Sequence, residues 1–314
     1  MKSKHKPVLL QEIITLLEIQ PGDLVVDATL GGGGHALKLL NEMHNQGTLI
    51  AIDFDQIAIN RFRTEMEAKL KVKFTQITEQ HWQLKIKKLR IDLVQSNFKF
   101  IQKILKELEI SNVNAIYADL GFSSDQLEAE DFGLSFLNDQ VLDMRLDKNL
   151  QITAADLLNA LYEKELTTLF SSLGDFSFSK QLARKIIAVR KTKPFKTTND
   201  LSEIIKQVVP FYFRKGANKH PEAKAFQALR IAVNDELGSL RTFLPLAFRN
   251  LGSGGKLAVI SFHSGEDRIV KQFFTKKLRT NQGAKLASLI KPSNAEISEN
   301  NRSRSAKLRA IKKI

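Results

Sequence analysis

The apolar and polar positions of the chain follow two alternating patterns. Short apolar runs rich in β-branched residues predict buried strands at residues 24–26, 48–52, 71–77, 114–120 and 256–262. Segments with apolar residues at helical spacing lie between them, at residues 36–43, 56–70 and 94–108. Because strands and helices alternate, the sequence predicts an α/β fold with a parallel sheet that is wound on both faces.

This alternation stops between residues 128 and 223. That segment has no clear strand and predicts short helices at residues 154–162, 166–173, 179–190 and 198–208. The sheet pattern then resumes with a long amphipathic helix at 222–248, and a last short strand is expected at 307–311. We therefore expect two domains. Residues 1–127 and 224–314 form the sheet domain, and residues 128–223 form an inserted helical domain.

The turn after the first strand carries candidate chemistry. Asp27 ends that strand, and four consecutive glycines at 31–34 precede the next helix. Glycines let the backbone take positive φ and approach a ligand with no Cβ in the way. Asp53 ends the second strand, about where a carboxylate accepts both hydroxyls of a ribose. This series predicts a nucleotide-type cofactor site.

Two cofactors present an adenosine ribose to such a site, a nicotinamide dinucleotide and S-adenosylmethionine. The turn reads T-L-G-G-G-G-H and lacks the G-x-G-x-x-G spacing that seats a pyrophosphate. Asp27 and Asp53 also suit a cationic cofactor better than an anionic one. The residues therefore favour S-adenosylmethionine over a dinucleotide.

The composition limits the chemistry of the protein and its expected location in the cell. The chain has no cysteine, which excludes disulfides, thiolate metal sites and cysteine nucleophiles. No apolar run approaches the roughly 18 residues of a membrane span, and no complete signal peptide is visible. The six histidines have no His/Glu spacing that predicts a metal site. We expect a soluble, cytoplasmic protein that does not bind a membrane.

The net charge of +14 is unevenly distributed. Residues 1–170 contain 19 basic and 24 acidic residues, whereas residues 171–314 contain 29 and 10. Two segments, 180–196 and 301–314, have basic but no acidic residues. A solvated helix face is the alternative for either segment alone, but both together favour a nucleic-acid partner over an acidic metabolite. The cations expected to hold its phosphates are Arg184, Lys185, Arg190, Lys191, Lys193, Arg302, Arg304 and Arg309.

Eight segments match a known family in the family's order. They read HKPVLLQEI, DATLGGGGH, AIDFD, DLGFSSDQL, LDMRLD, KHPEAKAFQALRIAVNDEL, ISFHSGEDRIVK and NRSRSAKLR. Through them the chain resembles the MraW/RsmH family. These bacterial methyltransferases use S-adenosylmethionine to modify the exocyclic N4 amine of a cytosine in the decoding region of 16S ribosomal RNA. The resemblance implies a class I, Rossmann-like methyltransferase sheet with an inserted helical domain that recognises the substrate.

The resemblance also implies which residues hold the cofactor. The family's contacts carry over to Gly33, Gly34, His35, Asp53, His81, Asp119 and Gln126. His81 stands where the family often has Phe, and the adjacent Trp82 is the alternative. Gly265 stands where Leu is usual in the family. The implied partner is small-subunit ribosomal RNA, within the small ribosomal subunit, and the oligomeric state stays open.

Asp119 is the candidate catalytic residue. The lone pair of a cytosine amine is delocalised into the ring, so an acceptor that binds the amine hydrogens favours a more nucleophilic nitrogen. Asp119 comes at the carboxyl end of a predicted strand, where an α/β sheet delivers such a group. Related amino-methyltransferases have an acid or amide followed by Pro-Pro-aromatic here. This chain has no prolines there but has Phe122, which either stacks on the base or belongs to the core.

The other polar motifs each allow two interpretations. His263 either relays protons in the pocket or hydrogen-bonds the following turn at 266–268. The charged residues at 142–147 are expected to form a structural ion-pair cluster rather than a phosphate clamp. Arg230 and Asn234 either face RNA or tie their helix to the insert.

Three classes of function remain in view. The first is a ribosomal RNA cytosine methyltransferase. The second is a methyltransferase for DNA or a small molecule; the family match disfavours DNA, and the basic half disfavours a metabolite. The third is a non-catalytic RNA-binding or assembly protein that retains a cofactor pocket. The intact Gly33, Gly34, Asp53 and Asp119 argue against it.

Overall fold

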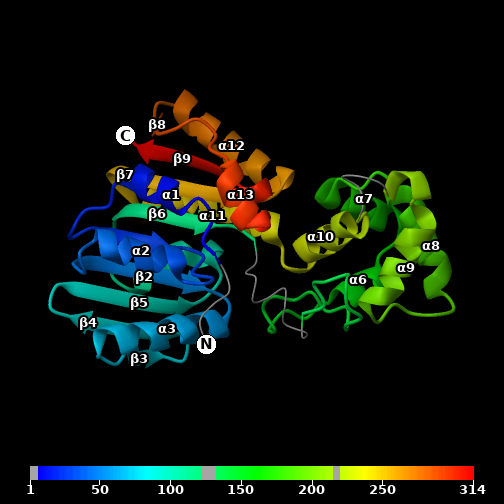
Figure 1. The fold of residues 1–314 in the computed structure, drawn as a ribbon, viewed down its shortest axis with the longest axis horizontal. Helices are drawn as coiled ribbons and strands as arrows, with labels where there is room; N and C mark the ends of the chain where they lie inside the picture. Colours follow the sequence, from blue (N-terminus) through cyan, green and yellow to red (C-terminus); the bar gives the residue numbers. More distant parts are fainter. Residues whose placement is uncertain (1–5, 122–131, 215–219) are drawn as a thin grey trace. The chain divides into compact units, whose positions relative to one another are not determined.

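The computed structural model describes residues 6–121, 132–214 and 220–314. The chain divides into two compact units, which are shown in Figure 1. The sheet unit comprises Met1–Ser123 and Leu237–Ile314, and the helical unit comprises Ser124–Glu236.

The sheet unit is built around a mixed sheet. In its described part nine strands pair in the order β3-β4-β5-β2-β1-β6-β7-β9-β8. The five strands from β5 to β7 in that order are parallel, and β9 is antiparallel to β7. The strands are β1 (Leu24–Asp27), β2 (Gly47–Asp53), β3 (Thr75–Thr78), β4 (His81–Ile86), β5 (Leu89–Gln95), β6 (Val113–Asp119), β7 (Leu251–Ser261), β8 (Gly283–Lys285) and β9 (Lys307–Lys313).

Helices cover both faces of this sheet. Alternate residues of the parallel strands, such as Leu49 and Ile91, join one hydrophobic core with residues of α1 (Leu10–Leu17), α2 (Gly34–Glu42) and α3 (Gln56–Leu70). The residues between them on the strands, such as Ile50 and Ile116, are equally buried but belong to the other face. The remaining helices of the unit are α4 (Ile101–Glu107), α11 (Glu236–Asn250), α12 (Ser264–Arg279) and α13 (Asn294–Glu299), with the 3-10 helices η1 (Phe98–Phe100) and η4 (Asn301–Ser305). The doubly wound, Rossmann-like sheet of the predicted class I methyltransferase fold is thereby confirmed.

One part of this sheet differs from the prediction. The strand expected at 71–77 is only the short, exposed edge strand β3. The parallel neighbour of β2 is instead β5, which forms a hairpin with β4. The helix expected at 94–108 therefore begins only with η1 and α4. The hairpin turns through Lys87 and Lys88, and Lys87 has φ 51°. Turns of this kind favour glycine or asparagine, so two lysines gave no turn signal in the sequence.

The helical unit contains the four predicted helices. They are α6 (Ala154–Ala160), α7 (Glu163–Gly174), α8 (Ser179–Arg190) and α9 (Thr198–Val208). The threonine before α6 and the threonine before α9 each form a capping box with an aspartate three residues later, which explains where these helices begin. The unit also contains η2 (Phe211–Arg214) and α10 (Glu222–Val233).

The structure corrects the second domain boundary and the long helix at 222–248. The helical unit extends to Glu236 rather than 223, because α10 packs closely on α7. A Cβ on Gly174 would lie 2.4 Å from the carbonyl oxygen of Lys224, so this approach requires glycine. The predicted single helix is broken between α10 and α11 at Asn234, whose side chain accepts from the Leu146 amide (2.8 Å) and donates to the Met144 carbonyl (2.8 Å). In the described parts of the chain, no helix is both long enough and apolar enough to cross a membrane.

Candidate functional site

Three acidic residues end neighbouring strands of the sheet. Asp27 ends β1, Asp53 ends β2 and Asp119 ends β6, and β1 pairs with both other strands. The three strands are parallel, so the acids lie at one edge of the sheet. In α/β folds, ligands bind at this carboxyl edge.

The glycine turn is fitted against this edge. Gly31 has φ 50°, and its amide donates to Asp53 Oδ2 (2.7 Å). Gly33 has φ 79°, and a Cβ at this position would lie 2.6 Å from Cδ2 of Phe62. Arg61 donates from Nη2 to the Gly31 carbonyl (3.0 Å), so both the amide and the carbonyl of Gly31 are hydrogen-bonded. The backbone thus holds a conformation that only glycine adopts without strain.

Asp53 is buried and oriented by the backbone. Oδ1 accepts from the Asp55 amide (2.9 Å), and Oδ2 accepts from the Gly31 amide. Burial raises the pKa of Asp53 to about 6, although these two hydrogen bonds oppose the shift. Each carboxylate oxygen has a further lone pair. Asp53 can therefore accept from two hydroxyl groups in a fixed geometry.

Asp27 is buried with one unpaired oxygen. Oδ1 accepts from the Thr29 amide (3.1 Å), whereas Oδ2 has no hydrogen-bond partner among the described residues. Burial raises the pKa of Asp27 to about 7, a hydrogen bond from Thr29 opposes this, and the charge of Asp53 raises it further. A cation at this edge would offset the cost of ionising Asp27.

Asp119 offers a second free acceptor. Its amide donates to Thr29 Oγ1 (2.6 Å), and its buried Oδ1 has no partner in the described part of the chain. Burial raises the pKa of Asp119 well above its usual range; Asp27 adds to the shift, a hydrogen bond from Tyr117 opposes it, and Glu266 raises it again. The site therefore contains a carboxyl group poised to receive a hydrogen-bond donor or a proton.

His35 does not present its side chain to this edge. It is buried, with Nε2 3.0 Å from the Val8 carbonyl and Nδ1 2.9 Å from the Tyr117 hydroxyl. If His35 contacts the cofactor, the contact therefore comes from its backbone, which lies in the first turn of α2. Tyr117, which contacts His35 here, was not among the residues predicted from the sequence. The signal was available, since Tyr117 lies two residues before Asp119 on β6 and so shares its face of the sheet.

His81 and Trp82 lie on opposite faces of β4. Trp82 is buried in the core, whereas His81 is half-buried. The His81 Nε2 lies 2.9 Å from Oδ1 of the buried Asp92. Burial disfavours the charged form of Asp92, but hydrogen bonds from His81, Arg90 and Gln83 outweigh it and lower its pKa. Gln126 and Phe122 lie outside the described residues.

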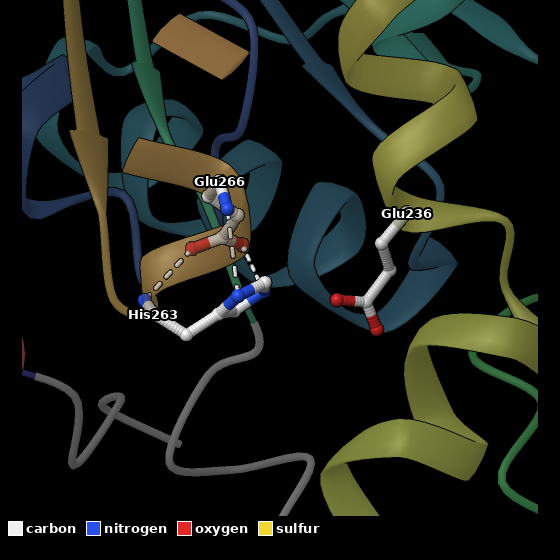
Figure 2. A group of neighbouring side chains, drawn as sticks. All are labelled: Glu236, His263 and Glu266. Atoms are coloured by element: carbon white, nitrogen blue, oxygen red, sulfur yellow. Dashed lines mark hydrogen bonds and ion pairs between the residues drawn. The ribbon is translucent and has the colours of Figure 1, made fainter. Parts of the chain in front are cut away.

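His263 is the N-cap of α12. Figure 2 shows the Glu266 carboxylate turned back toward His263. Glu266 accepts from the His263 amide (3.2 Å), and His263 Nδ1 accepts from the Glu266 amide (3.4 Å). Of the two interpretations from sequence, this capping box supports the hydrogen bond to the turn rather than a proton relay.

Two other motifs are structural. Arg145 binds both carboxylate oxygens of Asp143 (2.7 and 2.9 Å) and the Leu150 carbonyl (2.6 Å). The expected ion-pair cluster is thus confirmed for these two residues, whereas Asp147 accepts from the Asn149 amide (2.9 Å). Arg230 pairs in the same two-pronged way with Glu236 (2.8 and 2.9 Å). The contacts of Asn234 described above favour the interpretation that it ties its helix to the helical unit, whereas Arg230 binds the first residue of the next helix, α11.

The predicted phosphate-binding cations divide into two groups. Four are bound within the protein. Arg184 pairs with Glu163 (3.0 Å), Lys193 with Asp200 (2.7 Å) and Arg309 with Asp267 (2.7 Å), and Arg190 donates to the carbonyls of Leu158 and Leu161 (2.7 Å each). The other four are exposed and make no side-chain hydrogen bond or ion pair with the described residues: Lys185, Lys191, Arg302 and Arg304.

Comparison with known proteins gives consistent matches along the chain. The model of the MraW methylase family matches residues 2–314. The ribosomal RNA small subunit methyltransferase H of Lactobacillus johnsonii is 41% identical over 330 residues, covering 100% of both chains. The protein of the same name from Dictyoglomus thermophilum is 42% identical, covering 98% of this chain and 96% of its own. Among solved structures, an rRNA methylase from Streptococcus thermophilus is 11% identical with a TM-score of 0.41, covering 98% of each chain.

Proposed function

Since this chain belongs to the MraW methylase family, we propose that it transfers a methyl group from S-adenosylmethionine to the exocyclic N4 amine of a cytosine in the decoding region of 16S ribosomal RNA. Its full-length relatives are ribosomal RNA small subunit methyltransferases. Within the molecule, the observation that carries the proposal is the row of carboxylates formed by Asp27, Asp53 and Asp119 at the carboxyl edge of the sheet.

The residues at this edge fit S-adenosylmethionine. Asp53 would accept from the two ribose hydroxyls, and the buried, unpaired Oδ2 of Asp27 would lie in the field of a cation. When bound, the cofactor supplies a methyl group activated by a positively charged sulfur. The glycine turn does not favour a pyrophosphate, because it carries no G-x-G-x-x-G spacing. The further proposed contacts are Gly33, Gly34, the backbone of His35, His81 and Gln126.

Asp119 is the proposed catalytic residue. Its unpaired Oδ1 would accept a hydrogen of the target amine and hold the nitrogen in line for attack. The amine becomes positively charged as the new bond forms, so a nearby carboxylate stabilises the transition state more than the ground state. The raised pKa of Asp119 also suits it to take the proton that the amine must lose.

The proposed partner is small-subunit ribosomal RNA within the small ribosomal subunit. We assign cofactor binding to the sheet unit and substrate recognition to the inserted helices. The exposed cations Lys185, Lys191, Arg302 and Arg304 are the best candidates for phosphate contacts from the predicted set. Arg184, Arg190, Lys193 and Arg309 would first have to leave the partners described above.

Mass spectrometry of nucleosides from small-subunit RNA tests the proposal. RNA from cells with the gene should contain an N4-methylated cytidine that is absent without the gene, and the purified protein should restore it. Restoration by wild type but not by Asp119→Ala would identify the enzyme activity. An unchanged nucleoside profile would refute the ribosomal RNA activity. Restoration by Asp119→Ala as well would instead remove Asp119 from the chemistry.

A further inference from the structure

We propose that Tyr117 and His35 form a buried proton relay behind Asp119, which moves the proton released by amine methylation into the protein interior. This inference rests on the proposed function and assigns roles to two side chains outside the reacting groups. Tyr117 is fully buried on β6, and His35 is buried in the first turn of α2.

The Tyr117 hydroxyl lies between two acceptors. On one side it is 2.9 Å from His35 Nδ1. On the other it hydrogen-bonds the Asp119 carboxylate, which lies on the same face of β6. His35 Nε2 is 3.0 Å from the Val8 carbonyl, which only accepts, so Nε2 carries a hydrogen. In neutral His35, Nδ1 is then an acceptor. One hydroxyl hydrogen therefore faces two acceptors.

One extra proton completes this network in either of two ways. If it is on Asp119, the carboxyl donates to Tyr117 and Tyr117 donates to His35. If it is on His35, Nδ1 donates to Tyr117 and Tyr117 donates to the Asp119 carboxylate. The two arrangements differ by the shift of two hydrogens along one line. A network of this kind can take up a proton at Asp119 and deliver it to His35.

The reaction supplies that proton. A nitrogen–carbon bond forms as the carbon–sulfur bond of the methyl donor breaks, and the electron pair of the broken bond stays on sulfur. The amine nitrogen then loses one proton to the Asp119 carboxylate. Asp119 passes a proton to Tyr117, and Tyr117 passes its own to His35 Nδ1. Asp119 is again an anion, and His35 is an imidazolium held by Tyr117 and Val8.

The surroundings favour the protonated forms of both Asp119 and Tyr117. Asp27 on β1 and Glu266 on α12 face Asp119, and both raise its pKa. Burial raises the pKa of the Tyr117 hydroxyl well above the usual value, and the charges of Asp119 and Asp27 raise it further. A free tyrosinate is thus disfavoured, so Tyr117 conducts protons by exchanging them rather than by ionising.

Tyr117→Phe tests the relay, because it removes the hydroxyl and keeps the buried ring. Ser239→Ala is the control, since it removes another buried hydroxyl from the same unit. We expect Tyr117→Phe to lower kcat by about 10- to 100-fold, less than the full contribution of a general base, with the KM for RNA unchanged. Loss of the Tyr117 hydrogen bond should also raise the pKa of Asp119, so the acidic limb of the pH–rate profile should move to higher pH.

Nitrogen-15 NMR of His35 provides a readout that does not depend on turnover. Asp119→Asn should change the His35 titration in the parent protein but not in the Tyr117→Phe background, because the hydroxyl couples the two groups. A His35 titration that ignores Asp119→Asn, or a Tyr117→Phe enzyme with normal kcat and pH profile, would overturn the relay. Absence of methyl transfer in the wild type would instead refute the proposed function, while the NMR arm would still test the coupling.

A second observation carries an independent inference. One face of α12 presents four exposed cations, Arg268, Lys271, Lys276 and Arg279, that make no ion pair or hydrogen bond through their side chains with the described residues. A hollow of about 590 Å³ runs along this face, and its lining contains no acid. We infer that this face binds the phosphates of the RNA substrate.

The local field supports this assignment. Burial lowers the pKa of the neighbouring Lys277, and the charges of Lys276, Lys313 and Arg249 lower it further. The cations around Lys277 thus make the electrostatic potential of this region positive. The helix begins beside Glu266, whose charge acts on Asp119, so the cationic face starts near the carboxyl edge of the sheet. A polyanion is the partner that this surface fits.

Salt dependence of RNA binding tests this face. The triple variant Lys271→Gln, Lys276→Gln and Arg279→Gln should flatten the log–log slope for a single-stranded fragment of small-subunit RNA by about 2, or about 0.7 per lost phosphate contact. The control changes three cations of the same unit that already pair with acids: Lys38→Gln, Lys73→Gln and Lys103→Gln. An equal effect of both triples, or no effect of the first, would overturn the assignment. Failure of the wild type to bind this RNA would also refute the proposed partner.

Discussion

The buried carboxyl of Asp27 makes the stability of the sheet unit depend on pH. Its pKa is 3.8 in an unperturbed chain and about 7 in the fold. The unfolded chain therefore releases this proton at lower pH than the folded chain does. Folding stability contributed by Asp27 is full below about pH 4, declines as pH rises, and is lost above about pH 7. Asp27→Asn removes this decline, because an amide does not ionise.

The magnitude follows from the size of the pKa difference. A shift of about 3 units corresponds to about 4 kcal/mol between the two limits. At pH 4.5 about 1 kcal/mol of this cost is already present, so about 3 kcal/mol separates pH 4.5 from pH 8. The amide nitrogen that Asp27→Asn introduces would lack a partner at a cost of about 1–3 kcal/mol, but this cost is the same at both pH values. The change with pH therefore reports the ionisation of Asp27 together with its effect on the neighbouring Asp119.

Urea unfolding followed by tryptophan fluorescence measures this effect. Trp82 is the single tryptophan of the chain and is buried in the core of the sheet unit, so its emission reports the unit that contains Asp27. Relative to the parent, Asp27→Asn should gain about 3 kcal/mol in unfolding free energy between pH 4.5 and pH 8. Glu65→Gln, which removes an exposed carboxyl from α3, should show no such gain. An equal difference from the parent at both pH values would refute the reasoning.

Ligand binding gives the same residue a functional signature. A cation beside Asp27 would stabilise its ionised form, so Asp27→Asn should weaken binding of S-adenosylmethionine. The demethylated product carries no sulfonium charge, and its affinity should change less. Calorimetric titration of both ligands at pH 8 measures the difference. Equal losses for both would show that Asp27 does not respond to the charge on sulfur.

Three further changes test other parts of the site. Asp53→Ala should weaken S-adenosylmethionine binding by about 2–4 kcal/mol through loss of two charge-assisted hydrogen bonds, and near-normal affinity in a calorimetric titration would exclude the ribose contact. Asp119→Asn should retain more methyl transfer than Asp119→Ala at similar RNA affinity, because an amide oxygen still accepts the amine hydrogen; equal turnover of both would contradict this role. Arg190→Gln should destabilise the helical unit by about 1–3 kcal/mol, because the carbonyls of Leu158 and Leu161 lose a charged donor, whereas an unchanged urea midpoint with weaker RNA binding would restore Arg190 to the RNA contacts.

Local sequence determined most of the helices. The structure places helices at Gln56–Leu70, Ser179–Arg190 and Thr198–Val208, the same bounds that apolar spacing predicts. Two of these helices also have local start signals, because the side chain of Asp55 and the side chain of Thr197 cap the helices that follow them. Residues two to four positions apart make these interactions, so the local sequence contains them.

The hairpin of β4 and β5 shows where that pattern was insufficient. The alternation of Trp82, Leu84 and Ile86 is a strand signal, but the turn at Lys87 and Lys88 lacks the usual glycine or asparagine. The break between α10 and α11 at Asn234 also could not be predicted from the local sequence. It depends on the backbone of Met144 and Leu146, which are about 90 residues away in the chain.

The acids of the site could be predicted from the sequence, whereas the partners of the surrounding cations could not. The sequence alone placed Asp27, Asp53 and Asp119 together, because parallel strands bring their carboxyl ends to one edge whatever the details of packing. It could not decide which cations are available to RNA or that Tyr117 meets His35. The polarity of a side chain and its position in the apolar pattern predict whether it is exposed or buried. Its partner is chosen only when segments distant in sequence pack together, since a hydrogen bond or ion pair requires two groups within about 3 Å.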